Sequence, residues 1–120
     1  QLAVVEVLLA NGAQIDLANN NGATPLNCAA SFGYEAVAKA LLAKGAQVDL
    51  AGKDGSTPLY WAANNGHETV VSVLLTSGAQ VNLAQNEGNT PLVQAADEGH
   101  EAVVVALLAK GAQVDKINDL

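Results

Sequence analysis

The chain has 120 residues and a formal net charge of −7, with five lysines and no arginine, and half of its residues are hydrophobic although only 3% are aromatic. Nucleic acids and anionic membrane surfaces are bound mainly through Lys and Arg, so this charge balance argues against both as partners. No run of residues approaches the roughly 18 consecutive apolar residues that a membrane-spanning helix needs.

The chain contains a single cysteine, Cys28. One cysteine cannot form an internal disulfide, which is compatible with a reducing compartment. We therefore expect an intracellular, cytoplasmic protein.

The sequence repeats itself with a period of 33 residues. The motif Gly-x-Thr-Pro-Leu begins at Gly22, Gly55 and Gly88, and Gly-Ala-Gln begins at Gly12, Gly45, Gly78 and Gly111. A fixed period of this length indicates an architecture of stacked repeats. In this frame the chain is one domain, with a partial repeat (1–18), three full repeats (19–51, 52–84 and 85–117) and the start of a truncated repeat (118–120).

Each repeat predicts two helices. In the second full repeat, Thr57 stands where an N-cap is wanted and Pro58 follows at the first helical position. This predicts a short first helix over residues 58–65, which Gly66 ends by adopting a left-handed conformation. The second helix, over residues 68–76, is apolar on several sides and should therefore be packed on several sides. An Asn-Gly or Asp-Gly pair before Thr-Pro-Leu indicates a hairpin-type turn.

The full pattern, G-x-T-P-L-x-x-A-A-x-x-G-x-E-x-V-x-x-x-L-L-x-x-G-A, resembles the ankyrin repeat over essentially the whole chain. The resemblance implies an all-α solenoid of stacked helix-turn-helix units with hairpin-like loops. It also implies that the turn tips and the first helices line a concave face that binds other proteins. The sequence departs from the family after Thr-Pro-Leu, where ankyrin repeats usually carry a His that bonds along the stack and this chain has Asn27, Tyr60 and Val93.

No residue pattern points to catalysis, a cofactor or a metal. His67 and His100 occupy the same position in successive repeats, roughly one 10 Å layer apart, so they cannot share a metal ion whose ligands lie about 2.1 Å away. We interpret them as polar supports of the turn between the two helices. Cys28 has no nearby base in the repeat frame and is interpreted as a small, half-buried thiol.

Positions that differ between repeats are free to serve a partner. Trp61 is the first candidate anchor and Phe32 the second, since interfaces favour large aromatic anchors; the alternative for Trp61 is partial burial between repeats. The acidic set Glu87, Asp97 and Glu98 suits a partner segment that carries Lys or Arg, unless it is an ordinary solvated face. The remaining candidate partner-binding residues are Asn20, Asn21, Ser31, Lys53, Asp54, Ser56, Asn64, Asn65, Asn86 and Asn89.

The favoured function is a non-catalytic protein–protein interaction module that binds a protein through its concave face. Two alternatives are an engineered or consensus-like scaffold without a natural partner, and the repeat segment of a larger effector or enzyme. Terminal repeats normally carry a polar outer face, and neither end of this chain does, so we also expect end-to-end self-association. The apolar residues concerned are Leu2, Val5, Leu8 and Leu9 at one end, and Val103, Val104, Leu107 and Leu108, which should be only partly covered, at the other.

Overall fold

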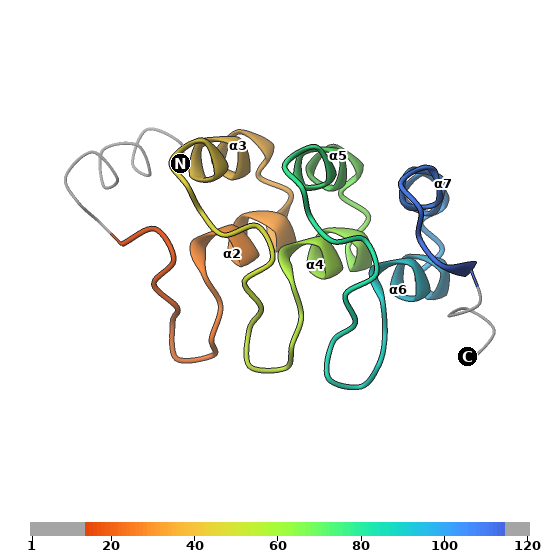
Figure 1. The fold of residues 1–120 in the computed structure, drawn as a ribbon, viewed down its shortest axis with the longest axis horizontal. Helices are drawn as coiled ribbons and strands as arrows, with labels where there is room; N and C mark the ends of the chain where they lie inside the picture. The colour runs from red at the N-terminus through yellow and green to blue at the C-terminus, as the bar shows by residue number, and fades with distance from the viewer. Residues whose placement is uncertain (1–13, 115–120) are drawn as a thin grey trace.

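The computed structural model describes residues 14–114, and its helices form two rows (Figure 1). One row holds the first helices, α2 (Pro25–Phe32), α4 (Pro58–Asn64) and α6 (Pro91–Asp97), and the other holds the second helices, α3 (Glu35–Ala43), α5 (Glu68–Thr76) and α7 (Glu101–Ala109). No strand occurs between residues 14 and 114. With principal dimensions of 47 × 25 × 20 Å, the molecule is elongated. These features confirm an all-α solenoid of stacked helix-turn-helix units.

Each first helix begins at the Thr-Pro pair, as the sequence predicts. The side-chain oxygens of Thr24, Thr57 and Thr90 each accept a hydrogen bond of 3.2 Å from the backbone N–H three residues later. The proline that follows lacks an N–H, which costs nothing at this position. In the second full repeat, α4 ends at Asn64 and Gly66 has a φ of +74°, so the predicted left-handed glycine is confirmed.

Hairpin-like loops project from the helices at residues 19–23, 52–56 and 85–89, which we call the turn tips (Figure 1). In the first tip, the N–H of Gly22 donates to the carbonyl of Asn19, and the N–H of Asn19 donates to the carbonyl of Ala23, both at 2.9 Å. Only the glycine is left-handed, with a φ of +79°. The tip is therefore a turn followed by one left-handed glycine, a common hairpin connection.

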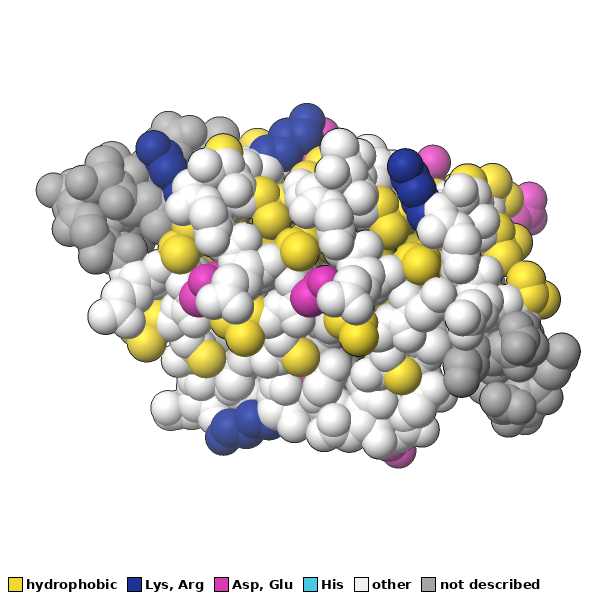
Figure 2. Space-filling view, in the orientation of Figure 1, with side chains coloured by type: hydrophobic (Ala, Val, Ile, Leu, Met, Phe, Trp, Pro, Cys, Tyr) yellow, Lys and Arg dark blue, Asp and Glu magenta, His cyan; other side chains and the backbone are white. Residues whose placement is uncertain are grey.

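The core is built from thin, repeated layers. The largest fully buried side chains include one leucine from every described helix: Leu26, Leu41, Leu59, Leu74, Leu92 and Leu107. The alanine pair Ala62 and Ala63 of α4 is completely buried, and such small side chains allow neighbouring helices to approach closely. On the surface, hydrophobic side chains recur at regular intervals along the length of the molecule (Figure 2).

The C-terminal edge of the helical stack is better covered than the sequence suggested. Val103 and Leu107, which we expected to be only partly covered, are buried to 1% and 0% exposure. They lie one helical turn apart on α7 and belong to the main hydrophobic core. Val104 is partly buried and Leu108 is 41% exposed, so these two residues are partly covered as expected, and the apolar outer side of α7 is narrower than predicted. Leu2, Val5, Leu8 and Leu9 lie outside the described residues.

Candidate functional site

An open groove with a volume of about 490 Å³ lies between the first helices and the turn tips of the first two full repeats. We call the surface formed by the turn tips together with α2, α4 and α6 the concave face. The groove is lined by residues of the tips (Asn21, Ala23, Gly52, Lys53 and Asp54), of α2 (Asn27, Cys28, Ser31 and Phe32) and of α4 (Trp61). Both predicted aromatic anchors therefore border the same groove.

Phe32 ends α2 and leaves 65% of its surface exposed. Its ring stacks on that of Tyr34, with centroids 5.7 Å apart and an interplanar angle of 26°. Tyr34, which is 46% exposed, was missing from the predicted partner-binding residues. The signal that could have found it is its position in the repeat, because Tyr34 stands where the other full repeats have His67 and His100.

Trp61 is half-buried, in agreement with the alternative of partial burial between repeats, yet it still borders the groove. It meets the ring of Tyr60 edge-on, with centroids 5.6 Å apart and an interplanar angle of 88°. Tyr60 itself is only 8% exposed. The half-buried indole of Trp61 is therefore in contact with the ring of a buried tyrosine.

The charges of four exposed carboxylates act on the Tyr60 hydroxyl: those of Asp54, Glu87, Asp97 and Glu98, which we call the acidic cluster. Burial raises the pKa of the Tyr60 hydroxyl, and the negative charges of the acidic cluster raise it further. Among the described residues, none of the four forms an ion pair, since the only salt bridge there joins Lys39 to Glu35. The nearby Lys53 directs its ammonium group to the carbonyl oxygen of Asn20, at 2.6 Å.

Some predicted partner-binding residues bond to the protein itself. Ser56 is completely buried, with its N–H and hydroxyl bonded to the carboxylate of Asp54 at 3.0 and 2.9 Å, so its assignment to the binding surface is wrong. Sequence comparison between repeats could not reveal this, because a position that varies can still be buried by a neighbouring side chain.

Other polar candidates link one repeat to the next. The side-chain amide of Asn65 donates to the carbonyl of Ser31 at 2.8 Å, and that of Asn86 donates to the carbonyl of Lys53 at 3.1 Å. Asn64 accepts a bond of 2.7 Å from Gln94. These groups hold the concave face in shape while staying wholly or partly exposed. Of the remaining candidates, Asn20 and Asn21 are exposed and Asn89 is half-buried.

The position after Thr-Pro-Leu is buried in all three repeats, with Asn27, Tyr60 and Val93 exposed by 3%, 8% and 3%. Asn27 retains one bond along the stack, from its side-chain amide to the carbonyl of Leu50 at 3.3 Å. Its Oδ1 atom is buried without a hydrogen-bond partner. The polar contacts that the family usually makes here are thus reduced, as the substitutions suggested.

The histidines have the structural role that the sequence suggested. Nε2 of His67 and of His100 lies 2.9 Å from the carbonyl oxygens of Ser31 and Asn64, one repeat earlier. Cys28, by contrast, is exposed rather than half-buried. Within residues 14–114, no three His, Cys, Asp or Glu side chains are placed to hold a metal ion.

Comparison with known proteins agrees with this architecture. The family model described as ankyrin repeats (3 copies) matches residues 48–118, and the one described as ankyrin repeats (many copies) matches residues 1–42. The chain therefore belongs to the ankyrin repeat family. No curated protein matches the chain. Ankyrin repeats are generally protein–protein interaction modules. None of the helices in the described part is long and apolar enough to cross a membrane.

Proposed function

We propose that this chain is a non-catalytic module that binds a protein partner through its concave face. The observation that carries the proposal is the groove bordered by Phe32 and Trp61, where an aromatic side chain is 65% exposed beside a hollow of about 490 Å³. Exposed aromatic rings that gather around a groove, unlike hydrophobic residues scattered singly, are typical of binding sites.

The groove is also held in shape before any partner arrives. Its walls belong to α2 and α4, and the two turn tips beside it are joined by the 2.6 Å bond from the ammonium group of Lys53 to the carbonyl of Asn20. A preorganised surface loses little conformational entropy on binding, so more of the contact energy appears as affinity.

Affinity capture with defined variants tests this function. The chain and a Phe32→Ala/Trp61→Ala/Asp97→Lys variant would each be used to capture proteins from a cell lysate. A Leu17→Ala variant is the control, because Leu17 is also exposed (65%) but lies outside the concave face. The proposal expects a protein that the wild-type chain and the control retain and the triple variant loses. Equal capture by all three would contradict recognition through the concave face.

We also propose that copies of the chain associate through the outer edge of α7. Val105 and Leu108 are exposed there, and a shallow hollow of about 290 Å³ borders Gly99 and Val104. In the preceding repeats the equivalent glycines, Gly33 and Gly66, are covered by the histidine ring of the next repeat, whereas a Cβ added at Gly99 would meet no other described residue within 4 Å. The edge thus has the shape of a surface onto which another repeat stacks.

The proposed function includes a location inside the cell. Cys28 is free and exposed. Exposed thiols persist most readily where the environment is reducing, so we propose that the protein acts inside the cell. The rate at which the purified chain oxidises in air to a Cys28-linked dimer would measure how strongly the free state of the thiol depends on a reducing environment.

A further inference from the structure

We propose that the concave face binds an extended peptide segment of its partner, in which a bulky apolar residue and a Lys or Arg are about three residues apart. This inference rests on the proposed function and specifies the chemistry of the partner. The apolar residue enters the groove between Phe32 and Trp61, and the basic side chain meets the acidic cluster one repeat further along the stack.

The groove supplies the apolar part of the site. The side chains of Ala23, Cys28, Phe32 and Trp61 give it a largely apolar wall. Phe32 is held by its stacking on Tyr34, and Trp61 by its contact with the buried Tyr60. Because each of these two rings already packs against another ring, each loses little conformational entropy when it contacts a side chain of the partner. This favours a single bulky anchor over a diffuse contact.

The acidic cluster supplies the charged part. Asp54, Glu87, Asp97 and Glu98 are exposed and come from the second and third turn tips and from the end of α6. No described Lys forms an ion pair with them, and the amine of Lys53 is bonded to a carbonyl in the opposite direction. Four carboxylates without a cation attract a positively charged group, which a Lys or Arg side chain supplies.

The geometry favours a side-chain cation over a metal ion or nucleic acid. The carboxylates are too widely spread to form a metal site, since no group of three possible ligands converges within the described residues. The phosphates of nucleic acid would be repelled by the same charges. A protein segment is the occupant that brings an apolar side chain and a cation together.

The positions of the two parts fix the spacing. The groove lies between the first and second full repeats, whereas three of the four carboxylates of the acidic cluster, Glu87, Asp97 and Glu98, belong to the third full repeat. Neighbouring helices pack about 10 Å apart, and an extended chain advances about 3.3 Å per residue. The two side chains of the partner are therefore about three residues apart.

Selection from a random peptide library displayed on phage tests the inference even while the natural partner is unidentified. The full chain is the target, and the enriched peptides should share a bulky apolar residue and a Lys or Arg at the stated spacing. Binding of a synthetic enriched peptide is then measured by the fluorescence of Trp61, the single tryptophan of the chain. Its emission should shift because the anchor packs against the indole.

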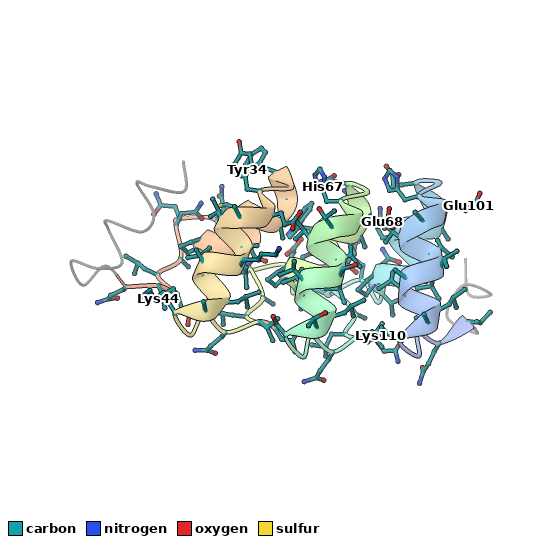
Figure 3. The ribbon with its side chains drawn as sticks, turned by 90° about the horizontal axis from the view of Figure 1, so that it is seen from above. Tyr34, Lys44, His67, Glu68, Glu101 and Lys110 are labelled. Carbon is teal, nitrogen blue, oxygen red and sulfur yellow. The ribbon has the colours of Figure 1, made fainter. Side chains whose placement is uncertain are left out.

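Two pairs of variants separate the two parts of the site. Asp97→Asn/Glu98→Gln should weaken peptide binding about fivefold to tenfold, whereas Ala43→Lys/Ala109→Lys should leave it unchanged. Both variants raise the net charge by two, but Ala43 and Ala109 are exposed in the last turns of α3 and α7. Those turns lie just before Lys44 and Lys110, at the C-terminal ends of the second helices. Glu68 and Glu101 mark the N-terminal ends of the second helices, on the other side of the row (Figure 3).

For the apolar part, Phe32→Ser should weaken binding about tenfold or more, and Leu17→Ser should not, although both remove an apolar side chain that is 65% exposed. Enriched peptides that lack a basic residue, or whose binding is insensitive to Asp97→Asn/Glu98→Gln, would overturn the inference. If such peptides still depended on Phe32, recognition by the concave face would stand. If no peptide were enriched, or none depended on either pair of variants, the inference would fail and the proposed function would lose this support.

Discussion

Nε2 of His67 lies 2.9 Å from the carbonyl oxygen of Ser31, and the imidazole ring sits directly against Gly33. Since the carbonyl can only accept, Nε2–H is the donor. His100 repeats the arrangement on Asn64 and Gly66. Each histidine thus caps the end of the first helix of the preceding repeat, and the glycine makes room for the ring. The histidines therefore link neighbouring repeats.

The first prediction separates two roles of the glycine that follows each first helix: its left-handed backbone conformation and the space that it leaves for the histidine ring. A Cβ at Gly66 would lie 2.6 Å from Nδ1 of His100, whereas a Cβ at Gly99 would meet no other residue of the described part of the chain within 4 Å. Both glycines are left-handed, with φ of +74° and +76°. Gly99→Ala should therefore lose only the conformational term, about 1–2 kcal/mol. Gly66→Ala should cost at least about 1 kcal/mol more, because the histidine bond is displaced. Urea unfolding of both variants measures the difference, and equal losses would contradict the role of His100.

The second prediction concerns Asp49, whose carboxylate accepts from the N–H of Gln80 at 3.2 Å. Burial raises the pKa of this carboxyl, and the bond from Gln80 only partly opposes the shift. The folded protein thus favours the neutral form, so the charge opposes folding above the ordinary pKa of 3.8. Asn82 occupies the same position in the next repeat and accepts from Gln113 at 3.0 Å, which shows that an amide fits.

Asp49→Asn should therefore match or exceed the stability of the wild type at neutral pH, and the gap should close in acid, where Asp49 is protonated. Asp49→Ala should lose about 1 kcal/mol, because the N–H of Gln80 is left without its acceptor. The urea midpoints of the three proteins, measured from neutral pH down into acid, provide the test. A loss of stability in Asp49→Asn as large as that in Asp49→Ala would show that the charge itself stabilises the fold.

Much of this fold could be predicted because the repeat motif encodes local chemistry. Thr57, Pro58 and Gly66 each specify a backbone event, and the structure places the N-cap, the helix start and the left-handed residue where the sequence indicated. The exposure of the individual side chains of α7 could not be predicted in the same way. Whether Val103 or Val104 points inward depends on the rotation of α7 against α5 and α6, and an all-apolar helix sequence does not reveal that rotation.

The candidate site was predicted less completely, because the comparison between repeats finds variable positions but not their environment. Phe32 and Trp61 border one groove as a result of how neighbouring repeats stack. Ser56 varies and is nevertheless buried against Asp54. Tyr34 was overlooked because its stacking on Phe32 across the left-handed Gly33 is a local geometry that residue identity alone does not show.

The third prediction follows from the raised pKa of Tyr60, which burial causes first and the acidic cluster second. Folding keeps the phenol neutral, so its contribution to stability is complete below the ordinary pKa of 10.0 and is lost as the pH rises through the higher folded value. Wild-type stability should therefore fall above about pH 10 more steeply than that of Tyr60→Phe.

Tyrosinate absorbance checks this directly in a Tyr34→Phe background, where Tyr60 is the single remaining tyrosine. The titration midpoint should lie above the ordinary value, and Asp97→Asn/Glu98→Gln should bring it down. An unshifted midpoint in the folded protein would show that the hydroxyl is solvated and that the acidic cluster does not act on it.

The fourth prediction tests association through the edge of α7. Leu108 and Val105 are 41% and 61% exposed there, and burying such side chains between copies would gain about 25 cal/mol for each square ångström of apolar surface. The average mass from sedimentation equilibrium should therefore rise with protein concentration. Val105→Glu/Leu108→Glu should abolish the rise, because two carboxylates would be desolvated in the contact.

Ser72→Glu, at an exposed position of α5, supplies a control for added negative charge. Retained association in the double variant would place the contact elsewhere, and a constant monomer mass of the wild type at all concentrations would contradict association altogether.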